Sequence, residues 1–273
     1  MTRVAALIVT SDSERWLPAT LASIAGQTRP PDELVAVDDG STDGTVDLLL
    51  AAGARVVPAT TTSLDVTTRI AQNFVHGVRL CAAADVVVLG DHDDVWHPSR
   101  IAHQVGLLEV WSQALMVSSD GVLVDADALP TGGTLRTAFP VTPDWDRLAP
   151  ADRMRTVLRS SVATGGASAI RPDAFPELDV PPGWLHDRWW SLVATARNGM
   201  IIDREAVIDY RVQPGQQLGL HAGAQLSGRA SRLAALIGQG GRARRKARDL
   251  RTRLRPLIDD PDVAAVVTLR NVL

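Results

Sequence analysis

The most reactive stretch of the sequence is the run Asp91-His92-Asp93-Asp94, in which every side chain can bind a cation or a proton. The run follows an apolar segment, residues 85–89, that has the length of a buried strand. Carboxylates this close repel one another unless a positive charge lies among them, and a divalent ion with oxygen ligands is the usual partner. Such an ion leaves coordination positions for substrate phosphates, so the run predicts a site that holds a diphosphate leaving group. An acidic turn that caps the following helix is the alternative.

A second acidic turn, Asp38-Asp39-Gly40-Ser41, closes another apolar segment at residues 34–37. An aspartate at this position can accept a hydrogen bond from a base or from a sugar hydroxyl. Because Asp-Gly pairs also form turns without any ligand, this motif taken alone favours a plain turn.

A third candidate is Asp187, which follows His186 in a segment that also contains Trp184, Trp189 and Trp190. A carboxylate in this place could take the proton from an attacking hydroxyl group. It could also be a helix N-cap, since aspartate is a preferred cap. The tryptophans could line a sugar site or pack in the core.

The first 115 residues alternate between apolar runs of strand length and segments with helical periodicity. The predicted strands are 4–10, 34–37, 55–57 and 85–89, and the predicted helices are 16–25, 45–52, 66–82 and 98–111. Such alternation predicts an α/β fold with a mainly parallel central sheet flanked by helices. Both acidic turns would then lie at the carboxyl ends of strands, where open parallel sheets bind their ligands.

From residue 115 onward the predicted segments become shorter. Strands are predicted at 116–119, 122–124 and 207–210, and helices at 151–161 and 184–196. The small residues of 165–170 predict a strand that other groups approach closely. The stretch 130–146 is rich in Pro, Thr and Gly and predicts a loop that could act as a mobile lid.

The composition is that of a globular protein, with 273 residues, 45% of them hydrophobic and 22% charged. No apolar run approaches the roughly 20 residues that a membrane-spanning helix needs. The first residues lack a signal-peptide pattern and Cys81 is the single cysteine, which excludes an internal disulfide, so we expect a cytoplasmic location. We expect Cys81 to pack on a helix.

The net charge of −3 hides a basic segment at residues 229–255, where ten Arg or Lys and one acid give +9, against −12 elsewhere. Leu250, Leu254 and Leu257 give this segment an apolar stripe beneath a cationic face. Such a helix could contact an anionic membrane, a partner chain or its own domain. No aromatic residues interleave with the arginines, so nucleic acid is not an expected partner.

Taken together, the motifs resemble family 2 glycosyltransferases of the GT-A fold, and among them the bacterial rhamnosyltransferase-like branch. The likeness covers residues 3–220 and is specific because the motifs occur in the family's order: the strand 4–10, Ser23-Ile24-Ala25-Gly26-Gln27-Thr28, Val37-Asp38-Asp39-Gly40-Ser41, Asn73-Phe74, Asp91-His92-Asp93-Asp94-Val95-Trp96 and His186-Asp187-Arg188-Trp189. It implies a GT-A domain over residues 1–220, with a nucleotide-sugar-binding half at 1–115 and an acceptor-side half at 116–220. A basic helical extension follows at 221–273.

The resemblance also implies a role for each matching residue. Asp187 would be the catalytic base, and Asp93, together with Asp91, would bind Mg²⁺ or Mn²⁺ on the donor's diphosphate. The remaining positions would contact the donor: Thr10, Asp12 and Asp39 around the base, Asn73 near the ribose or phosphates, Asp91 nearer the ribose, and His92 beside it.

The implied reaction is an inverting, metal-dependent transfer of a sugar from a nucleoside diphosphate to an acceptor hydroxyl. The branch points to a dTDP- or UDP-sugar, with dTDP-L-rhamnose first, and the acceptor could be a glycan, a lipid-linked molecule or a small molecule. One alternative is a nucleotidyltransferase that makes nucleotide sugars, although the acidic segment after the first strand lacks the glycine-rich, basic loop such enzymes need. The other alternative is a catalytically inactive binding protein. The sequence does not specify an oligomeric state.

Three positions depart from the family pattern. Asp12 stands where the family usually has Asn, and His92 stands where Gln is common. Gln213 follows the last predicted strand where the family often has a histidine, which a glutamine cannot replace as a charged phosphate contact. His221 could substitute, although a lone histidine of this kind is usually a surface residue.

Overall fold

The computed structural model describes residues 1–61, 65–175, 177–212 and 244–267. Four strands predicted in the first half form one side of a single sheet: β1 (Val4–Thr10), β2 (Glu33–Asp38), β3 (Arg55–Pro58) and β4 (Val86–Asp91). All three contacts among them are parallel, so β1, β2 and β4 end at the same edge. The prediction of alternating strands and helices is confirmed for this half.

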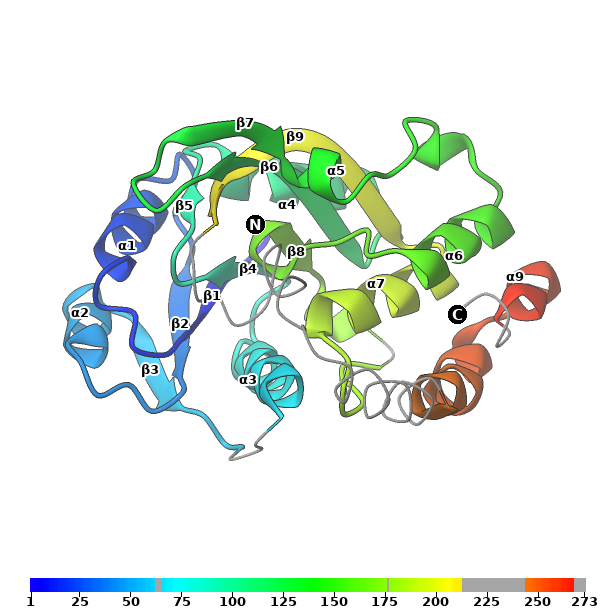
Figure 1. The fold of residues 1–273 in the computed structure, drawn as a ribbon, viewed down its shortest axis with the longest axis horizontal. Helices are drawn as coiled ribbons and strands as arrows, with labels where there is room; N and C mark the ends of the chain where they lie inside the picture. The colour runs from blue at the N-terminus through cyan, green and yellow to red at the C-terminus, as the bar shows by residue number, and fades with distance from the viewer. Residues whose placement is uncertain (62–64, 176, 213–243, 268–273) are drawn as a thin grey trace, which may run out of the picture.

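The second half completes a mixed sheet in the order β3-β2-β1-β4-β8-β6-β9-β5, with β7 pairing with β6 (Figure 1). The added strands are β5 (Val95–Trp96), β6 (Met116–Val124), β7 (Pro130–Thr134), β8 (Ser168–Ile170) and β9 (Met200–Arg211). The three residues of β8 run antiparallel to both β4 and β6. The sheet is therefore less parallel than predicted. Three residues are too few for the sequence to indicate the direction in which β8 runs.

Several predicted boundaries differ from the observed ones. The two short strands predicted at 116–119 and 122–124 are one strand, β6, whose register against β9 shifts between them. The loop predicted at 130–146 contains β7, helix α5 (Leu135–Ala138) and the 3₁₀ turn η1 (Trp145–Arg147). Within it, Arg136 donates hydrogen bonds to the carbonyl oxygens of Val162 (2.7 Å) and Ser118 (2.6 Å), which fixes this segment to the domain.

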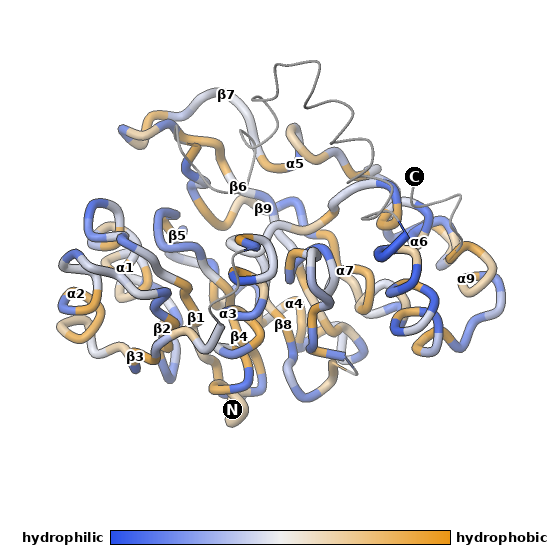
Figure 2. The backbone as a smooth tube through the Cα atoms, turned by 60° about the horizontal axis from the view of Figure 1, so that its bottom comes forward, coloured by the Kyte–Doolittle hydropathy of each residue, from blue (hydrophilic) through white to orange (hydrophobic). Residues whose placement is uncertain are grey.

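Helices cover both faces of the sheet and create two apolar cores. One face carries α1 (Leu17–Ala25), α2 (Thr45–Ala51) and α4 (Arg100–Val110). The other carries α3 (Val66–Leu80), α6 (Pro150–Arg159) and α7 (His186–Ala196). Figure 2 shows hydrophobic residues along β1 and β4 between these layers. None of the helices in the described ranges is long and apolar enough to span a membrane.

Helix α3 packs on the Leu7 side chain of β1 through a glycine. A Cβ atom added to Gly77 would lie 2.4 Å from Cδ1 of Leu7, so a larger residue here would require the buried Leu7 side chain or the helix to shift. The same helix ends at Cys81, which is buried as predicted. Because α3 rests directly on the sheet, Asn73 and Phe74 on its buried face reach the edge where β1 and β4 end.

The described part of the basic segment packs against the domain. A helix at 244–249 continues through η4 (Leu250–Leu254) and η5 (Arg255–Leu257), and α9 (Pro261–Val266) follows. Leu250 and Leu254 are buried in the same core as α7. Nε1 of Trp184 donates to Asp249 (3.0 Å), and the Lys246 ammonium lies 4.7 Å from the centre of the Trp184 ring.

The sequence left three partners open for the apolar stripe: a membrane, a partner chain and its own domain. In the described residues the stripe packs against its own domain. The rest of the basic segment, 229–243, lies outside the described residues, as do Gln213 and His221. Membrane contact by residues 229–255 therefore stays a prediction, which would now depend on exposed arginines such as Arg244, Arg248 and Arg251. Co-sedimentation with anionic liposomes would test it.

We expect Leu254→Ala to lower the free energy of unfolding by about 2–5 kcal/mol, because it opens a cavity in a packed core. Leu50→Ala is the matched control: Leu50 is 58% exposed, so its truncation removes little buried contact. Its expected effect is below about 0.5 kcal/mol. Chemical denaturation measures both, and equal effects would show that residues 244–257 do not pack on the domain in solution.

Candidate active site

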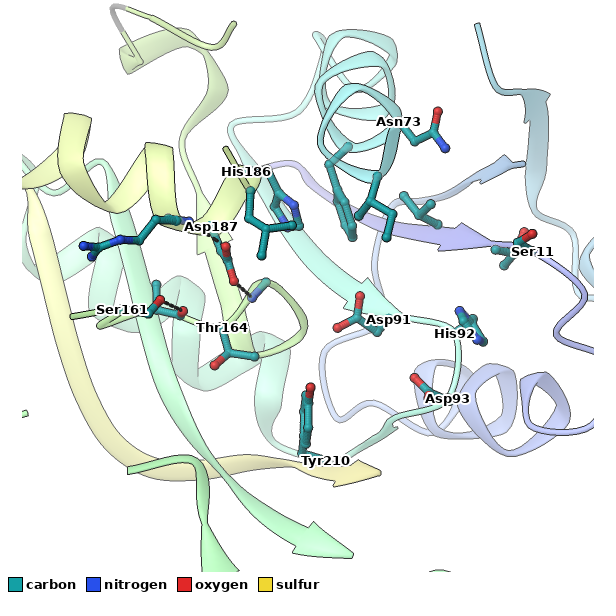
Figure 3. Close-up of a pocket in the computed structure, with 18 of the residues that line it drawn as sticks. Ser11, Asn73, Asp91, His92, Asp93, Ser161, Thr164, His186, Asp187 and Tyr210 are labelled. Carbon is teal, nitrogen blue, oxygen red and sulfur yellow. Dashed lines mark hydrogen bonds between the residues drawn. The ribbon is translucent and has the colours of Figure 1, made fainter. Parts of the chain in front are cut away.

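A pocket of about 520 Å³ lies where β1 and β4 end, bounded by α3, by the start of α7 and by Tyr210 on β9. Figure 3 shows Asp91, His92 and Asp93 on one side, Asp187 and Thr164 on another, and the Tyr210 hydroxyl directed inward. The structure thus joins residues from both halves of the domain. Each acidic candidate comes from the end of a strand or the first turn of a helix, where backbone amides are available to hold it.

The acidic run divides into two groups with different surroundings. Asp91 ends β4, and both it and Asp93 line the pocket. Asp94 is fully buried, and its Oδ1 accepts a hydrogen bond from the backbone N–H of Arg211 (3.0 Å). Helix α4 has Ser99 at its N-cap, so the run does not cap it, and that alternative is wrong.

Mutual repulsion and burial strongly perturb these carboxyl groups. Burial raises the pKa of Asp91 to about 7, with further contributions from the charges of Asp93 and Asp187. Burial also raises the pKa of Asp94 well above its ordinary range. The guanidinium of Arg100 opposes both shifts, and the charges of Asp91 and Asp94 in turn limit the fall of the Arg100 pKa, which burial lowers to about 9.

Asp91 and Asp93 offer the oxygen ligands that Mg²⁺ and Mn²⁺ prefer. Within the described ranges, no group of three or more His, Cys, Asp and Glu side chains is arranged to hold an ion alone. Two carboxylates still fit the usual arrangement for a substrate-bridged ion, in which phosphate oxygens and waters complete the coordination. The raised pKa of Asp91 also fits, since a cation at this position would relieve the repulsion.

Asp187 lies in the first turn of α7 at the opposite wall of the pocket. Its Oδ2 accepts a hydrogen bond from the N–H of Gly165 (3.1 Å), and its Oδ1 accepts one from the N–H of Arg188 (2.6 Å). Burial raises the pKa of Asp187 to about 6, and the two hydrogen bonds partly offset that shift. The N-cap of α7 is Leu185, so Asp187 is not the cap, although it binds a free first-turn amide.

Arg188, the next residue in the chain, also lines the pocket, but its guanidinium is hydrogen-bonded to backbone groups. The guanidinium of Arg188 donates to the carbonyl oxygens of Leu158 (2.9 Å) and Ser160. These hydrogen bonds hold the guanidinium at the end of α6. Asp187 keeps a carboxylate of raised basicity at the pocket wall, which suits a general base.

His186 and the tryptophans beside Asp187 have separate roles. The His186 ring stacks on Phe74 at 3.8 Å and meets Trp190 edge-on, and burial lowers its pKa to about 3, so it is neutral. Trp184, Trp189 and Trp190 are buried and none of them lines the pocket. Of the two interpretations left open by the sequence, core packing is the one observed.

Thr10, Asp39, Asn73 and His92 line the pocket, and their contact with a donor stays a prediction. Oδ2 of Asp39 pairs with Nε of Arg69 (2.7 Å), while both amide atoms of Asn73 are buried and have no hydrogen-bond partner among the described residues.

Asp12 differs from the other predicted donor contacts. It is exposed, lies outside the pocket lining and has a left-handed backbone conformation (φ 44°). Its Oδ1 accepts hydrogen bonds from the backbone N–H (2.8 Å) and the hydroxyl of Thr42. It therefore joins the two strand-end turns, and its contact with a nucleotide base stays a prediction.

Sequence reasoning missed several lining residues, among them Gly165, His186 and Tyr210. Tyr210 lies near the end of the predicted last strand, but nothing in the sequence shows that this strand reaches the pocket. Gly165 belongs to the small-residue segment for which a close approach was predicted. The approaching groups are His186 and Asp187.

Comparison with known proteins agrees with this geometry. The family described as Glycosyl transferase family 2 matches residues 6–171. A search of curated proteins gives no significant match.

Among solved structures, glucosyl-3-phosphoglycerate synthase from Mycobacterium tuberculosis, in complex with Mn²⁺, UDP and glucosyl-3-phosphoglycerate, superposes with a TM-score of 0.56. It is 20% identical over 78% of this chain and 73% of its own. S. aureus TarS in complex with UDP also has a TM-score of 0.56, with 17% identity over 78% of this chain and 61% of its own. At these identities the likeness shows the fold, which is that of GT-A glycosyltransferases.

We expect Asp187→Asn to change how stability depends on pH. Because the pKa of Asp187 rises from 3.8 to about 6 on folding, the folded chain holds this proton more tightly. Its stabilising contribution is present below pH 3.8 and is lost as the pH rises through 6, by up to about 1.4 kcal/mol per pH unit. The stability of Asp187→Asn relative to the wild type should therefore increase between pH 4 and pH 7.

Urea denaturation with a chelator present measures this difference. Asp146→Asn is the control, since Asp146 is exposed and lies outside the pocket lining. Parallel stability curves for Asp187→Asn and the wild type would contradict the raised pKa.

Proposed function

Since the chain belongs to glycosyl transferase family 2 and is a glycosyltransferase, we propose that this pocket transfers a sugar from a nucleoside diphosphate to an acceptor hydroxyl with inversion. One observation supports this most directly. Asp91 and Asp93 occupy one wall of a single pocket, and Asp187 occupies the opposite wall with a pKa of about 6. A diphosphate held at the first wall places the sugar between the two.

The proposed reaction is a single displacement. Asp187 accepts the proton of the acceptor hydroxyl while its oxygen bonds to the anomeric carbon and the bond from that carbon to the diphosphate breaks. Attack from the face opposite the leaving group inverts the configuration. Asp91 and Asp93 would hold Mg²⁺ or Mn²⁺, which when bound neutralises charge on the departing nucleoside diphosphate.

Donor recognition is proposed for the same edge of the sheet. Thr10 and Asp39 would contact the base side, and Asn73, Asp91 and His92 the ribose and phosphates. The amide of Asn73 supports this assignment. It has no hydrogen-bond partner in the described part of the chain, and a buried amide in that state is costly unless a ligand or water satisfies it. Asp12 would affect binding of the base only indirectly, by holding the turn that contains Thr42.

For the nucleotide we propose a UDP- or dTDP-sugar. The solved relatives are named with UDP or UDP-glucose, which supports UDP. The motif likeness to the rhamnosyltransferase branch supports dTDP-L-rhamnose. Family membership favours sugar transfer over synthesis of nucleotide sugars. A cytoplasmic location remains part of this proposal, supported by the buried free thiol of Cys81.

A donor panel tests the proposal directly. Purified protein is incubated with Mn²⁺ or Mg²⁺ and with UDP-glucose, other UDP-sugars or dTDP-L-rhamnose, and released nucleoside diphosphate is measured. We expect release with at least one donor, increased by an acceptor alcohol and abolished by EDTA. Nucleotide binding by calorimetry without any release would favour an inactive binding protein instead, and absence of both would overturn the proposal.

Two substitutions separate the proposed roles at the two walls. We expect Asp93→Asn to weaken Mn²⁺-dependent binding of UDP, because it removes an oxygen ligand of full charge. We expect Asp187→Asn to leave UDP binding unchanged and to lower kcat by about 10²–10⁴-fold, the usual contribution of a general base. Calorimetry and turnover assays measure the two effects, with exposed Asp146→Asn as the control. Wild-type turnover in Asp187→Asn would remove this residue from the mechanism.

A further inference from the structure

The 3₁₀ turn η2 (Gly165–Ala167) lies between the two carboxylates that the proposed reaction uses. Its position follows from the register of β8, which pairs Val88 of β4 with Ala169 in antiparallel fashion. Continued by three residues, the register places Gly166 opposite Asp91. The insertion of a short antiparallel strand beside β4 therefore carries the turn back over the end of that strand.

Two consecutive backbone amides of the turn serve different walls of the pocket. The N–H of Gly165 donates to Oδ2 of Asp187 (3.1 Å), the dashed contact in Figure 3. The backbone of Gly166 hydrogen-bonds to the Asp91 carboxyl group. Two adjacent peptide groups, linked at the Cα atom of Gly165, thus join the carboxylate proposed to face the metal to the carboxylate proposed to take the proton.

Neither glycine has room for a side chain. A Cβ atom at Gly165 would lie 2.4 Å from Nε2 of His186, and that ring is confined by Phe74 on one face and by Trp190 at its edge. A Cβ atom at Gly166 would lie 2.7 Å from Oδ2 of Asp91 and 2.6 Å from Oδ2 of Asp94. Contacts this short require a shift. Alanine at position 165 would move the His186 ring or the turn, and alanine at position 166 would move Asp91, Asp94 or the turn.

Hydrogen bonds from buried polar side chains hold the turn and the neighbouring strand in place. Gln104 on α4 donates from Nε2 to the carbonyl oxygen of Ala167 (2.9 Å), and Arg100 donates to that of Leu89 in β4. The hydroxyl of Ser168 donates to the carbonyl oxygen of Thr164 (2.7 Å), which closes the turn. Gln104 and Arg100 are both fully buried, so this platform has little freedom to move.

We propose that Gly165 and Gly166 are positioning residues that set the separation of Asp91 and Asp187, and with it the distance from the held diphosphate to the proton acceptor. The inference rests on the proposed function of the pocket. It predicts that the two glycines, although adjacent, affect different steps. Gly166 acts on the Asp91 wall, and Gly165 acts on the Asp187 wall.

The test compares Gly165→Ala, Gly166→Ala and Gly106→Ala. Gly106 lies in α4, where an added Cβ atom would meet no other atom within 4 Å, so its substitution is the matched control and should leave every readout unchanged. We expect Gly165→Ala to lower kcat by at least about 10-fold with unchanged Mn²⁺-dependent UDP binding, since a displacement near 1 Å can cost about 100-fold. We expect Gly166→Ala to weaken Mn²⁺-dependent UDP binding by a similar factor.

Circular dichroism spectra and thermal midpoints are measured for each variant, so that unfolding is distinguished from displacement of Asp91 or Asp187. Where an alanine variant does not fold, Ser168→Ala decides the question, because it removes one of the two hydrogen bonds to the carbonyl oxygen of Thr164 that close the turn and adds no atoms. We expect it to lower both kcat and UDP affinity while the protein stays folded. Unchanged parameters in the folded variants, or equal effects of Gly165→Ala and Gly166→Ala on binding and turnover, would overturn the inference. Inactivity of the wild type would instead overturn the proposed function.

Discussion

The energetic problem at the centre of this structure is the burial of several carboxyl groups in and directly behind one pocket. Asp91, Asp94 and Asp187 all have raised pKa values, and burial is the main cause for each. The guanidinium of Arg100, stacked at 3.9 Å on the Trp96 ring, lies beneath Asp91 and Asp94 and offsets part of this cost. Repulsion that remains in the unliganded protein is the force that would favour a divalent cation.

Much of the surrounding fold holds these groups together. The parallel strands β1, β2 and β4 bring Thr10, Asp39 and Asp91 to one edge, and α3 approaches that edge closely because Gly77 has no side chain. From the other side, Arg211 at the end of β9 donates its backbone N–H to Asp94 and its Nε to the carbonyl oxygen of Asp93. The acidic run is thus held in place by β9, the last strand of the domain, as well as by β4, the strand at whose end it begins.

The sequence predicts the parts of this arrangement that local patterns encode. Strand ends at Asp38 and Asp91 are readable because an apolar run stops at an acidic turn, and the order of the motifs identifies the family. Features that depend on tertiary contacts are not readable in this way. The direction of β8, the link between Asp12 and Thr42, and the burial of Leu250 and Leu254 against α7 each depend on a partner distant in sequence. The tryptophans illustrate the same limit, since their spacing fits a sugar site and a core equally well.

The contacts that join the two walls of the pocket are made largely by main-chain atoms. Gly165 and Gly166 supply amides, and Arg211 supplies another to Asp94. A backbone amide keeps its hydrogen bond when neighbouring side chains change, so residues such as Phe139, Ser161 and Leu185 on the same pocket can differ without moving the carboxylates. This arrangement would separate the geometry of the proposed reaction from the shape of the pocket wall formed by these side chains. Substitutions at that wall could then alter which acceptor fits while the proposed chemistry is kept.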